Sequence, residues 1–199
     1  MTKKTDATSL DGDTYWVIKP DQLQCLTSPI RGDIIDHLVG RGPMAIKQIA
    51  ASLGRQPSSI YYHIEKLLEV GLIEEAGRQV VNRRTEILYK TPGKKMRVKK
   101  ALANTDNRDV ITQTVFGLLR QSQRDFERGY ERSSMKIDGD DRNMGFFRLV
   151  NRPSPESLAE INGYLERIAE ILWSERDETQ PLVAFAWTMS PLDDGASED

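Results

Sequence analysis

The sequence predicts a mainly α-helical fold with a small β component (α+β). Apolar residues recur at the three- and four-residue spacing of a helix in five segments of the chain. Between the third and fourth of these segments, two apolar and β-branched runs flank a charged tip, which indicates a hairpin. Of the 199 residues, 38% are hydrophobic, enough for a packed core and against a wholly disordered chain. This length predicts one or two domains, at roughly 100–200 residues per domain.

Composition excludes several classes of protein. No apolar run approaches the ~20 residues needed to cross a bilayer. The polar stretch 5–15 supplies no signal-peptide core. Cys25 is the only cysteine, which excludes a disulfide framework and a thiolate-cluster metal site. These observations predict a cytoplasmic protein without a membrane partner.

The net charge of −2 conceals two oppositely charged blocks. Residues 41–100 carry 13 basic and 5 acidic side chains, a net charge of +8. Residues 101–199 carry 11 basic and 19 acidic side chains, a net charge of −8. This asymmetry favours a module that binds a polyanion, joined to a second unit. A solvated surface with uneven charge is the alternative explanation.

Three helices are predicted in the N-terminal half. Thr27 or Ser28 can cap the first, and Pro29 suits its first turn. Gly54 ends the second, and after a three-residue turn Pro57 begins the third. The predicted helices cover residues 26–39, 46–53 and 57–70.

A hairpin is predicted directly after these helices. Its strands cover 72–81 and 85–91, and Asn82, Arg83 and Arg84 form the charged tip. Two short helices joined by a tight glycine turn and followed by a basic-tipped hairpin make a winged helix-turn-helix.

The domain organisation follows from these patterns. A proline–glycine step and a run of basic residues over 94–100 indicate a linker or the start of a basic helix. The polar N-terminus and the acidic C-terminal tail are predicted to be disordered. The predicted parts are a disordered N-terminus over 1–14, a winged helix-turn-helix domain over 15–93, a dimerisation or effector domain over 94–192, and a disordered tail over 193–199.

The third helix has a polar face suited to DNA. At about 100° per residue, its apolar residues form one buried stripe. Tyr61 and His63 lie on the two shoulders of the helix. Hydroxyls, a phenol and an ammonium can contact phosphates or base edges, and the helix N-terminus favours a phosphate. The residues opposite the stripe are Ser58, Ser59, Tyr62 and Lys66. An ordinary amphipathic helix with a solvated face is the competing interpretation.

The hairpin adds a second candidate contact with DNA. Arg78, Arg83 and Arg84 sit on or beside its predicted tip, where basic side chains can follow the backbone or enter a minor groove. A solvated turn is the structural alternative. His63 and His37 have no second histidine or cysteine at ligand spacing, so no metal site and no cofactor are predicted.

These residues resemble the winged-helix regulators of the arsenic-repressor (ArsR) type. The resemblance covers roughly residues 22–92. It rests on a first-helix pattern at Pro29, Arg31, Ile34 and Ile35, on a recognition-helix pattern at Ser58, Tyr61, His63, Ile64, Leu67, Gly71, Leu72 and Ile73, and on Tyr89 in the returning wing strand.

The resemblance implies a homodimeric transcription regulator that places its third helix in the major groove of double-stranded DNA. The sequence departs from the family at Ala45, where a serine or threonine often caps the second helix. Metal-sensing members use cysteines or sets of aspartate and histidine. The second helix here has no cysteine and the C-terminal half has no histidine, which argues against a metal or arsenic sensor.

The acidic half is predicted to be a helix–strand–helix–strand unit. Its helices cover 107–132 and 154–175, and its strands cover 145–150 and 182–189. The helical stripes suit pairing between subunits and an internal core equally well. Five aromatic residues can line a pocket for an unidentified small-molecule effector or fill a core: Phe146, Phe147, Trp173, Phe185 and Trp187.

Three functions compete on this reasoning. The leading one is a homodimeric, sequence-specific DNA-binding transcriptional regulator. The alternative is a winged-helix module that contacts protein or RNA without binding an operator. An enzyme is disfavoured, because the sequence contains no nucleophile elbow, P-loop, HExxH or Rossmann fingerprint.

Overall fold

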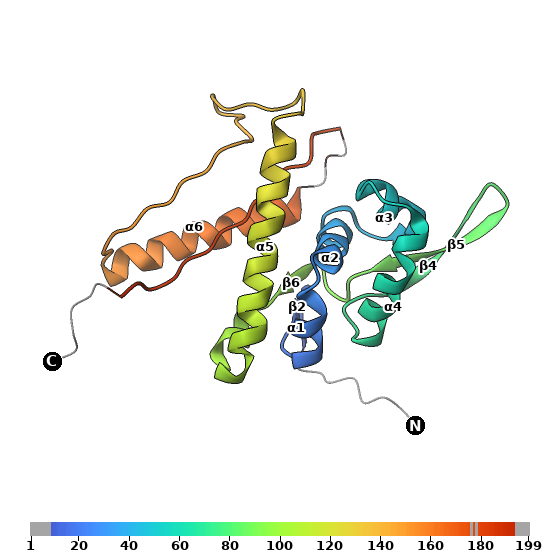
Figure 1. Ribbon diagram of the computed structural model, residues 1–199, viewed down its shortest axis with the longest axis horizontal. Coiled ribbons are helices and arrows are strands. Elements are labelled where there is room, and N and C mark those ends of the chain that lie inside the picture. The colour runs from blue at the N-terminus through green and yellow to red at the C-terminus, as the bar shows by residue number, and fades with distance from the viewer. Residues whose placement is uncertain (1–8, 176, 178, 194–199) are drawn as a thin grey trace.

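The computed structural model describes residues 9–175, 177 and 179–193. It confirms the α+β class, with helices throughout and small sheets in the N-terminal half. Figure 1 shows a hairpin projecting at one end of the molecule and a long helix at the other, with the remaining helices between them. The helices are α1 (Pro20–Leu26), α2 (Pro29–Arg41), α3 (Ile46–Ser52), α4 (Tyr61–Glu69), α5 (Arg108–Gly129) and α6 (Pro155–Ser174).

The core lies among the four N-terminal helices. Each contributes one apolar face, and α2 and α4 supply several of its fully buried side chains. Ser28 occupies the N-cap position of α2 without a side-chain capping bond, and Pro29 takes the first turn as predicted. At α3 the backbone N–H of Ala45 donates to Gln48 Oε1 at 2.8 Å, so the glutamine compensates in part for the missing hydroxyl cap. The side chains less than 2% exposed include Leu23, Ile34, Leu38, Ile49, Ile60 and Leu67.

The buried side-chain amide of Gln22 links α1 to the segment before it and to the end of α4. The Gln22 side chain donates from Nε2 to the Tyr15 hydroxyl at 2.8 Å and to the Val70 carbonyl at 3.0 Å. Cys25, also on α1, is buried beside it, and burial raises the pKa of its thiol. The thiol is therefore part of the core, and its burial favours the protonated form.

Two small sheets accompany these helices. In the first, β3 (Met44–Ala45) and β4 (Glu74–Val81) flank β5 (Arg84–Lys90), all antiparallel. Strands β4 and β5 form the predicted hairpin, with a bulge at Ala76. The second sheet joins β1 (Leu10–Asp11), β2 (Thr14–Trp16) and β6 (Lys95–Arg97), with β2 and β6 parallel.

The second sheet corrects two expectations. Residues 10–14 were expected to be disordered, but β1 pairs with β2 there; residues 1–8 lie outside the described chain. The basic run 94–100 is expected to be a linker or the start of a helix; Lys95–Arg97 form β6 instead, and a 3-10 helix, Lys99–Ala103, begins at the end of the run. Strands β2 and β6 are about 80 residues apart in the sequence, so no local sequence pattern indicates that they pair. Gly93 permits the pairing, because a Cβ there would lie 2.8 Å from both the Asp13 carbonyl oxygen and the Tyr15 nitrogen.

The two C-terminal helices form where the sequence predicts them. Helix α5 packs across α1 and α2. Helix α6 is capped by Ser154, whose Oγ accepts a hydrogen bond from the Ser157 backbone N–H at 3.2 Å. The division into domains over 15–93 and 94–192 stays a prediction, and all but Asp193 of the predicted tail lies outside the described residues.

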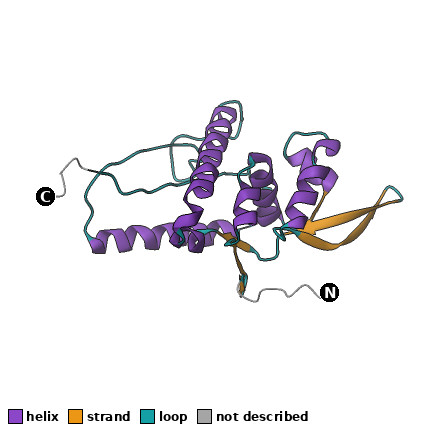
Figure 2. Cartoon of the chain, turned by 60° about the horizontal axis from the view of Figure 1, so that its bottom comes forward, coloured by secondary structure: helices purple, strands orange, loops and turns teal. Residues whose placement is uncertain are grey.

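The two strands predicted in the C-terminal half are wrong for the single chain. Residues 145–150 and 182–189 adopt no strand, and neither pairs with any described segment. Figure 2 shows both as loops that run lengthwise beside α6. Both segments have the apolar, aromatic and β-branched composition of strands, and 182–189 also alternates large and small side chains. A strand, however, requires a hydrogen-bonded neighbour, and the described chain offers none.

Candidate nucleic-acid interface

Helix α4 and the turn before it form a continuous unit with one buried side. Pro57 opens a 3-10 turn, Pro57–Ser59, and Ile60 connects it to α4 in helical conformation. Ile60, Ile64 and Leu67 are 0–2% exposed and lock this unit onto α2 and α3. The opposite side therefore has to face solvent.

That outer side carries the predicted polar residues. Ser58 and Ser59 are exposed, and Tyr61 and Tyr62 are 55% and 58% exposed. The Ser59 hydroxyl donates its proton to the Gln56 carbonyl at 2.8 Å. Its oxygen can therefore still accept a hydrogen bond but has no proton left to donate. Both phenol rings project without a hydrogen-bond partner among the described residues. Hydroxyls of this kind can donate to phosphates or base edges.

Lys66 lies on the same side but is already engaged. Its Nζ forms an ion pair with Glu69 at 2.7 Å and lies 5.9 Å from the centre of the Tyr62 ring. The hydrogen bond to Glu69, followed by its negative charge, raises the pKa of the partly exposed Lys66 ammonium. A phosphate contact by Lys66 must therefore replace or share the Glu69 carboxylate.

His63 is less accessible than its neighbours. It is half-buried, its Nδ1 is buried without a partner, and its ring meets the edge of Tyr62 at 5.5 Å between centres. Burial, then the charges of Arg31 and Arg55, lowers the pKa of His63. The imidazole is therefore neutral at pH 7. His63 stays a predicted contact residue, but its position favours support of Tyr62 over a phosphate contact.

The hairpin presents the predicted arginines in the open. Asn82 and Arg83 form its two-residue turn at φ +50° and +63°, and Val81 pairs with Arg84 below it. Arg83 thus holds a left-handed conformation that glycine or asparagine adopts more readily. Arg78, Arg83 and Arg84 are exposed, and none has a carboxylate within ion-pair distance in the described part of the chain.

A polar contact that the sequence did not reveal fixes the hairpin to α3. Lys47 Nζ on α3 forms an ion pair with Glu86 Oε1 on β5 at 2.6 Å, and Gln79 donates to the other carboxylate oxygen at 3.3 Å. The hydrogen bond from Lys47 lowers the pKa of Glu86. The contact joins residues 39 positions apart, so no local pattern indicates it. It links β5 of the hairpin to the helix that precedes α4.

Only part of the positive charge of the basic block is available on this side. Arg97 forms an ion pair with Glu166 of α6 at 2.6 Å, and Lys99 approaches the same carboxylate at 3.9 Å. The Trp173 ring of α6 lies under Lys95 and Arg97, at 5.4 and 4.7 Å. Figure 1 places α6 at the end of the molecule opposite the β4–β5 hairpin. The unpaired arginines of the hairpin thus lie far from α6 and its Glu166 carboxylate.

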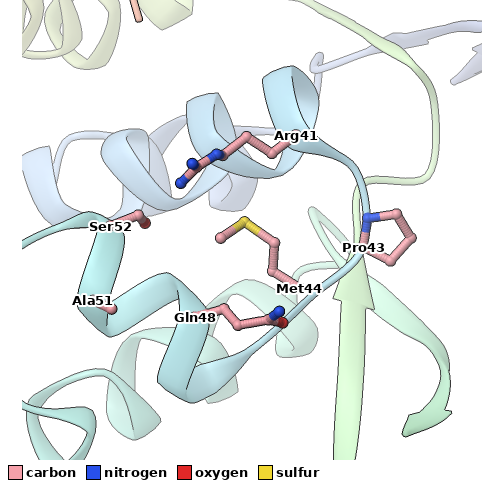
Figure 3. Close-up of a pocket in the computed structure, with 6 residues that line it drawn as sticks. All are labelled: Arg41, Pro43, Met44, Gln48, Ala51 and Ser52. Atoms are coloured by element: carbon pink, nitrogen blue, oxygen red, sulfur yellow. The ribbon is translucent and has the colours of Figure 1, made fainter. Parts of the chain in front are cut away.

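A separate hollow opens between α2, β3 and α3 (Figure 3). It has a volume of about 470 Å³ and lies beside none of the predicted DNA contacts. The Arg41 guanidinium and the Gln48 and Ser52 side chains border it, and Met44 lines its floor. The Gln48 side-chain oxygen is engaged by the Ala45 N–H, and Arg41 is the one charged residue among those that line the hollow.

The five aromatic residues considered as a pocket do not come together. Trp173 lies against β6, whereas Phe146 contacts Phe126 of α5 at 5.7 Å between ring centres. Phe146 and Phe147 are 86% and 85% exposed. Within the described residues no three His, Cys, Asp or Glu side chains gather at metal-binding distance. The described part of the chain also has no helix long and apolar enough to cross a membrane.

The fold therefore has the features of a winged helix-turn-helix: α3, a tight turn and α4, followed by the β4–β5 wing. Comparison with known sequence families agrees for the helical part, since residues 26–76 match a helix-turn-helix domain family. The chain thus carries a helix-turn-helix domain, which supports DNA binding.

Comparison with whole proteins adds little. No curated protein sequence matches the chain. Among solved structures, a transcriptional regulator from Thermotoga maritima is similar at 14% identity and a TM-score of 0.29, over 75% of this chain and 81% of that chain. A TM-score of 0.29 is too low to indicate a shared overall fold.

Proposed function

We propose that the chain is a homodimeric, sequence-specific DNA-binding transcriptional regulator of the ArsR-like type. The observation that carries the proposal is the shared exposure, at one end of the molecule, of the polar side of α4 and the unpaired arginines of the wing. The match of residues 26–76 to a helix-turn-helix domain supports the same function rather than an enzymatic one.

The proposed contacts divide by chemistry. Helix α4 enters the major groove, where Tyr61 and Tyr62 reach base edges or phosphates from its exposed side. Ser58 and Ser59, at the start of the turn before α4, bind the backbone. His63 positions Tyr62. On binding DNA, the Lys66 ammonium leaves its ion pair with Glu69 and pairs with a phosphate instead. The wing arginines Arg78, Arg83 and Arg84 follow the backbone or enter the adjacent minor groove.

A dimer is supported by the outer side of α5. Phe116 and Leu119 are 59% and 47% exposed and border a hollow of about 310 Å³ together with Arg120 and Gln123. Residues three and seven positions apart form the seam of a helix pair. Two copies would present two α4 helices to half-sites about one helical turn, ~34 Å, apart. In this proposal residues 94–192 dimerise, sense an unidentified small-molecule effector, or do both.

The ArsR-like assignment is supported by where its motif residues lie. Pro29 opens α2, Tyr89 is buried on the returning wing strand, and the recognition-helix pattern spans the turn and α4. Thiol-based sensing is disfavoured, since the single cysteine is buried in the core. No cofactor forms part of the proposal.

The test is selection of bound sequences from random duplex DNA by the purified protein, followed by affinity measurement at several salt concentrations. The proposal expects an enriched two-fold symmetric sequence and binding that weakens steeply with salt. Tyr62→Ala combined with Lys66→Ala should abolish the preference. A protein that enriches no duplex at low salt, but binds a protein or RNA partner, would instead be a winged-helix interaction module.

A further inference from the structure

The C-terminal half of the chain has almost no interior. Among the described residues from 108 onward, Gly117 alone is buried. Phe126 and Trp173 are half-buried, but many other large apolar side chains face solvent. Those at least half exposed include Phe116, Phe146, Phe147, Leu149, Val150, Ile137, Leu182, Phe185 and Leu192. Apolar surface on this scale marks a site of association in a folded protein.

The exposed area of the whole chain leads to the same conclusion. The chain exposes 15,120 Å². A compact monomer of 22.6 kDa exposes ~9,500 Å², so the excess is about 5,600 Å². Each partner of an obligate dimer contributes roughly 1,000–2,500 Å² to its interface. The excess includes the surface of the extended loops, and it is large enough to contain an extensive interface with a second protein surface.

The course of residues 145–189 indicates what kind of partner surface this half lacks. Residues 145–150 and 182–189 run in the same direction along α6, and α6 runs the opposite way between them (Figures 1 and 2). Two parallel extended segments joined by a helix follow the course of a βαβ unit. Neither segment has a backbone hydrogen bond to another strand in the described chain. The unit therefore has a helix in place but lacks a sheet.

The second segment has the composition of a paired strand. Val183, Phe185, Trp187 and Met189 alternate with Ala184, Ala186 and Thr188, so large apolar side chains share one face and small ones the other. The large residues are 49–51% exposed. A single flexible segment gains nothing from this alternation, whereas a strand in a sheet covered on one face requires it.

We propose that a second copy of the chain supplies the missing pairing: residues 145–150 and 182–189 of both copies form one intermolecular sheet covered by the two α6 helices. This inference rests on the proposed dimer and goes beyond it by adding, to the contact proposed for α5, a second contact through these two segments.

A second copy fits this surface better than an unrelated partner. Each copy presents the same two unpaired segments, and identical edges meet naturally about a two-fold axis. The two segments contain one charged side chain between them, Arg148, although the C-terminal block as a whole carries −8. Pairing through these segments thus brings the copies together where their like charges are sparse.

The proposed sheet is also connected to the DNA-binding unit. Helix α6 is held on β6 of the same chain by Glu166 against Arg97 and by Trp173 under that guanidinium. Joining two α6 helices through one sheet would therefore set the distance between the two winged helices. That distance determines which half-site spacing the dimer can bind.

The test compares Ala186→Pro with the matched control Ala186→Ser in the full-length protein. Proline removes a ladder N–H and restricts the strand, whereas serine keeps the backbone and adds one small polar atom. Sedimentation equilibrium should give a dimer for the unmodified chain and for Ala186→Ser. For Ala186→Pro the dimer dissociation constant should rise about 100-fold, as expected from loss of a central ladder position.

Amide hydrogen exchange of the unmodified protein gives a second readout that needs no variant. Residues 146–150 and 182–188 should be protected at high protein concentration and lose protection on dilution below the dissociation constant. Protection that does not depend on concentration would mean pairing within one chain, and no protection would mean no sheet; either result overturns the inference. If the protein is a dimer without this protection, the dimer of the proposed function stands and the sheet does not. A monomer that still selects duplex DNA overturns both the sheet and the dimer but leaves DNA binding intact.

Discussion

The two halves of this chain differ in how they use their apolar residues. Residues 9–107 contain every buried apolar side chain of the described structure, and all of them except Ala45 belong to one cluster that joins four helices and two small sheets. Residues 108–193 have regular amphipathic helices and two apolar extended segments, but of their described residues only a glycine is buried. The same local patterns therefore give a complete core in one half and an open surface in the other. Hydrophobic periodicity determines local structure, and burial additionally requires a partner surface.

The largest expected effect tests this contrast with one residue type in both halves. Leu67→Ala opens a cavity in the N-terminal core and should lower its free energy of unfolding by about 2–5 kcal/mol. Leu149→Ala, at a side chain that is 82% exposed, should change that free energy by less than about 0.5 kcal/mol. Urea titration followed by hydrogen exchange of the α4 amides measures both. Equal losses would mean that the two halves form one cooperative core.

The next effect compares how much arginines in each half contribute to DNA affinity. Arg83→Ala with Arg84→Ala removes two unpaired wing charges, each hydrogen bond of this kind being worth about 1.5–3 kcal/mol, so affinity should fall at least tenfold. The slope of log K against log salt should fall by about 2, at ~0.9 per phosphate contact. Arg132→Ala with Arg142→Ala removes the same charge from the C-terminal half, outside the two segments of the proposed sheet. An equal loss in that control pair would remove the wing from the interface.

A smaller effect distinguishes charge from backbone strain at the wing tip. Arg83→Gly relieves the left-handed conformation of Arg83 and should raise the free energy of unfolding by up to about 1 kcal/mol. Its DNA affinity should nevertheless fall as in Arg83→Ala. Asn82→Gly keeps every charge and should leave affinity unchanged. Thermal unfolding and DNA titration of the three variants check this, and a gain in affinity for Arg83→Gly would refute the contact.

The smallest effect is a pH dependence confined to the N-terminal half, which contains both histidines. The pKa of His63 is lowered in the folded state, so the unfolded chain binds the proton more readily. The stability that neutral His63 provides is therefore present above the ordinary histidine pKa of about 6.5 and is lost as pH falls through it. His63→Gln should reduce the loss of stability between pH 7 and pH 5 relative to the unmodified protein, measured by urea midpoints. If the stability of His63→Gln depended on pH as that of the unmodified protein does, the His63 imidazole would be exposed to solvent.

Much of the N-terminal fold could be predicted because its signals are local. The stripe of Ile60, Ile64 and Leu67 and the turn at Gly54 define the helix-turn-helix, and the wing was predicted with its strand ends shifted by a residue or two. The pairing of β2 with β6 was missed, because it joins residues about 80 positions apart. The C-terminal strands were predicted from the strand-like composition of 145–150 and 182–189, which cannot show whether a neighbouring strand exists.

The candidate site was predictable in composition and less so in detail. The outward direction of Tyr61 and Tyr62 follows from helix periodicity alone. The ion pair of Lys66 with Glu69 has the i,i+3 spacing of neighbours on a helix and could have been inferred. The contact of Lys47 with Glu86 depends on the packing of α3 against the wing, which no spacing reveals.

Hydrogen exchange of the full-length protein with and without its selected duplex tests the central claim most directly, because it follows both halves in one measurement. The proposed function predicts slower exchange on DNA binding at residues 58–66 and 78–84, with no change over α6. Protection confined to residues beyond 108, or no change at a saturating concentration of DNA, would contradict the assignment of α4 and the wing as the DNA-binding surface.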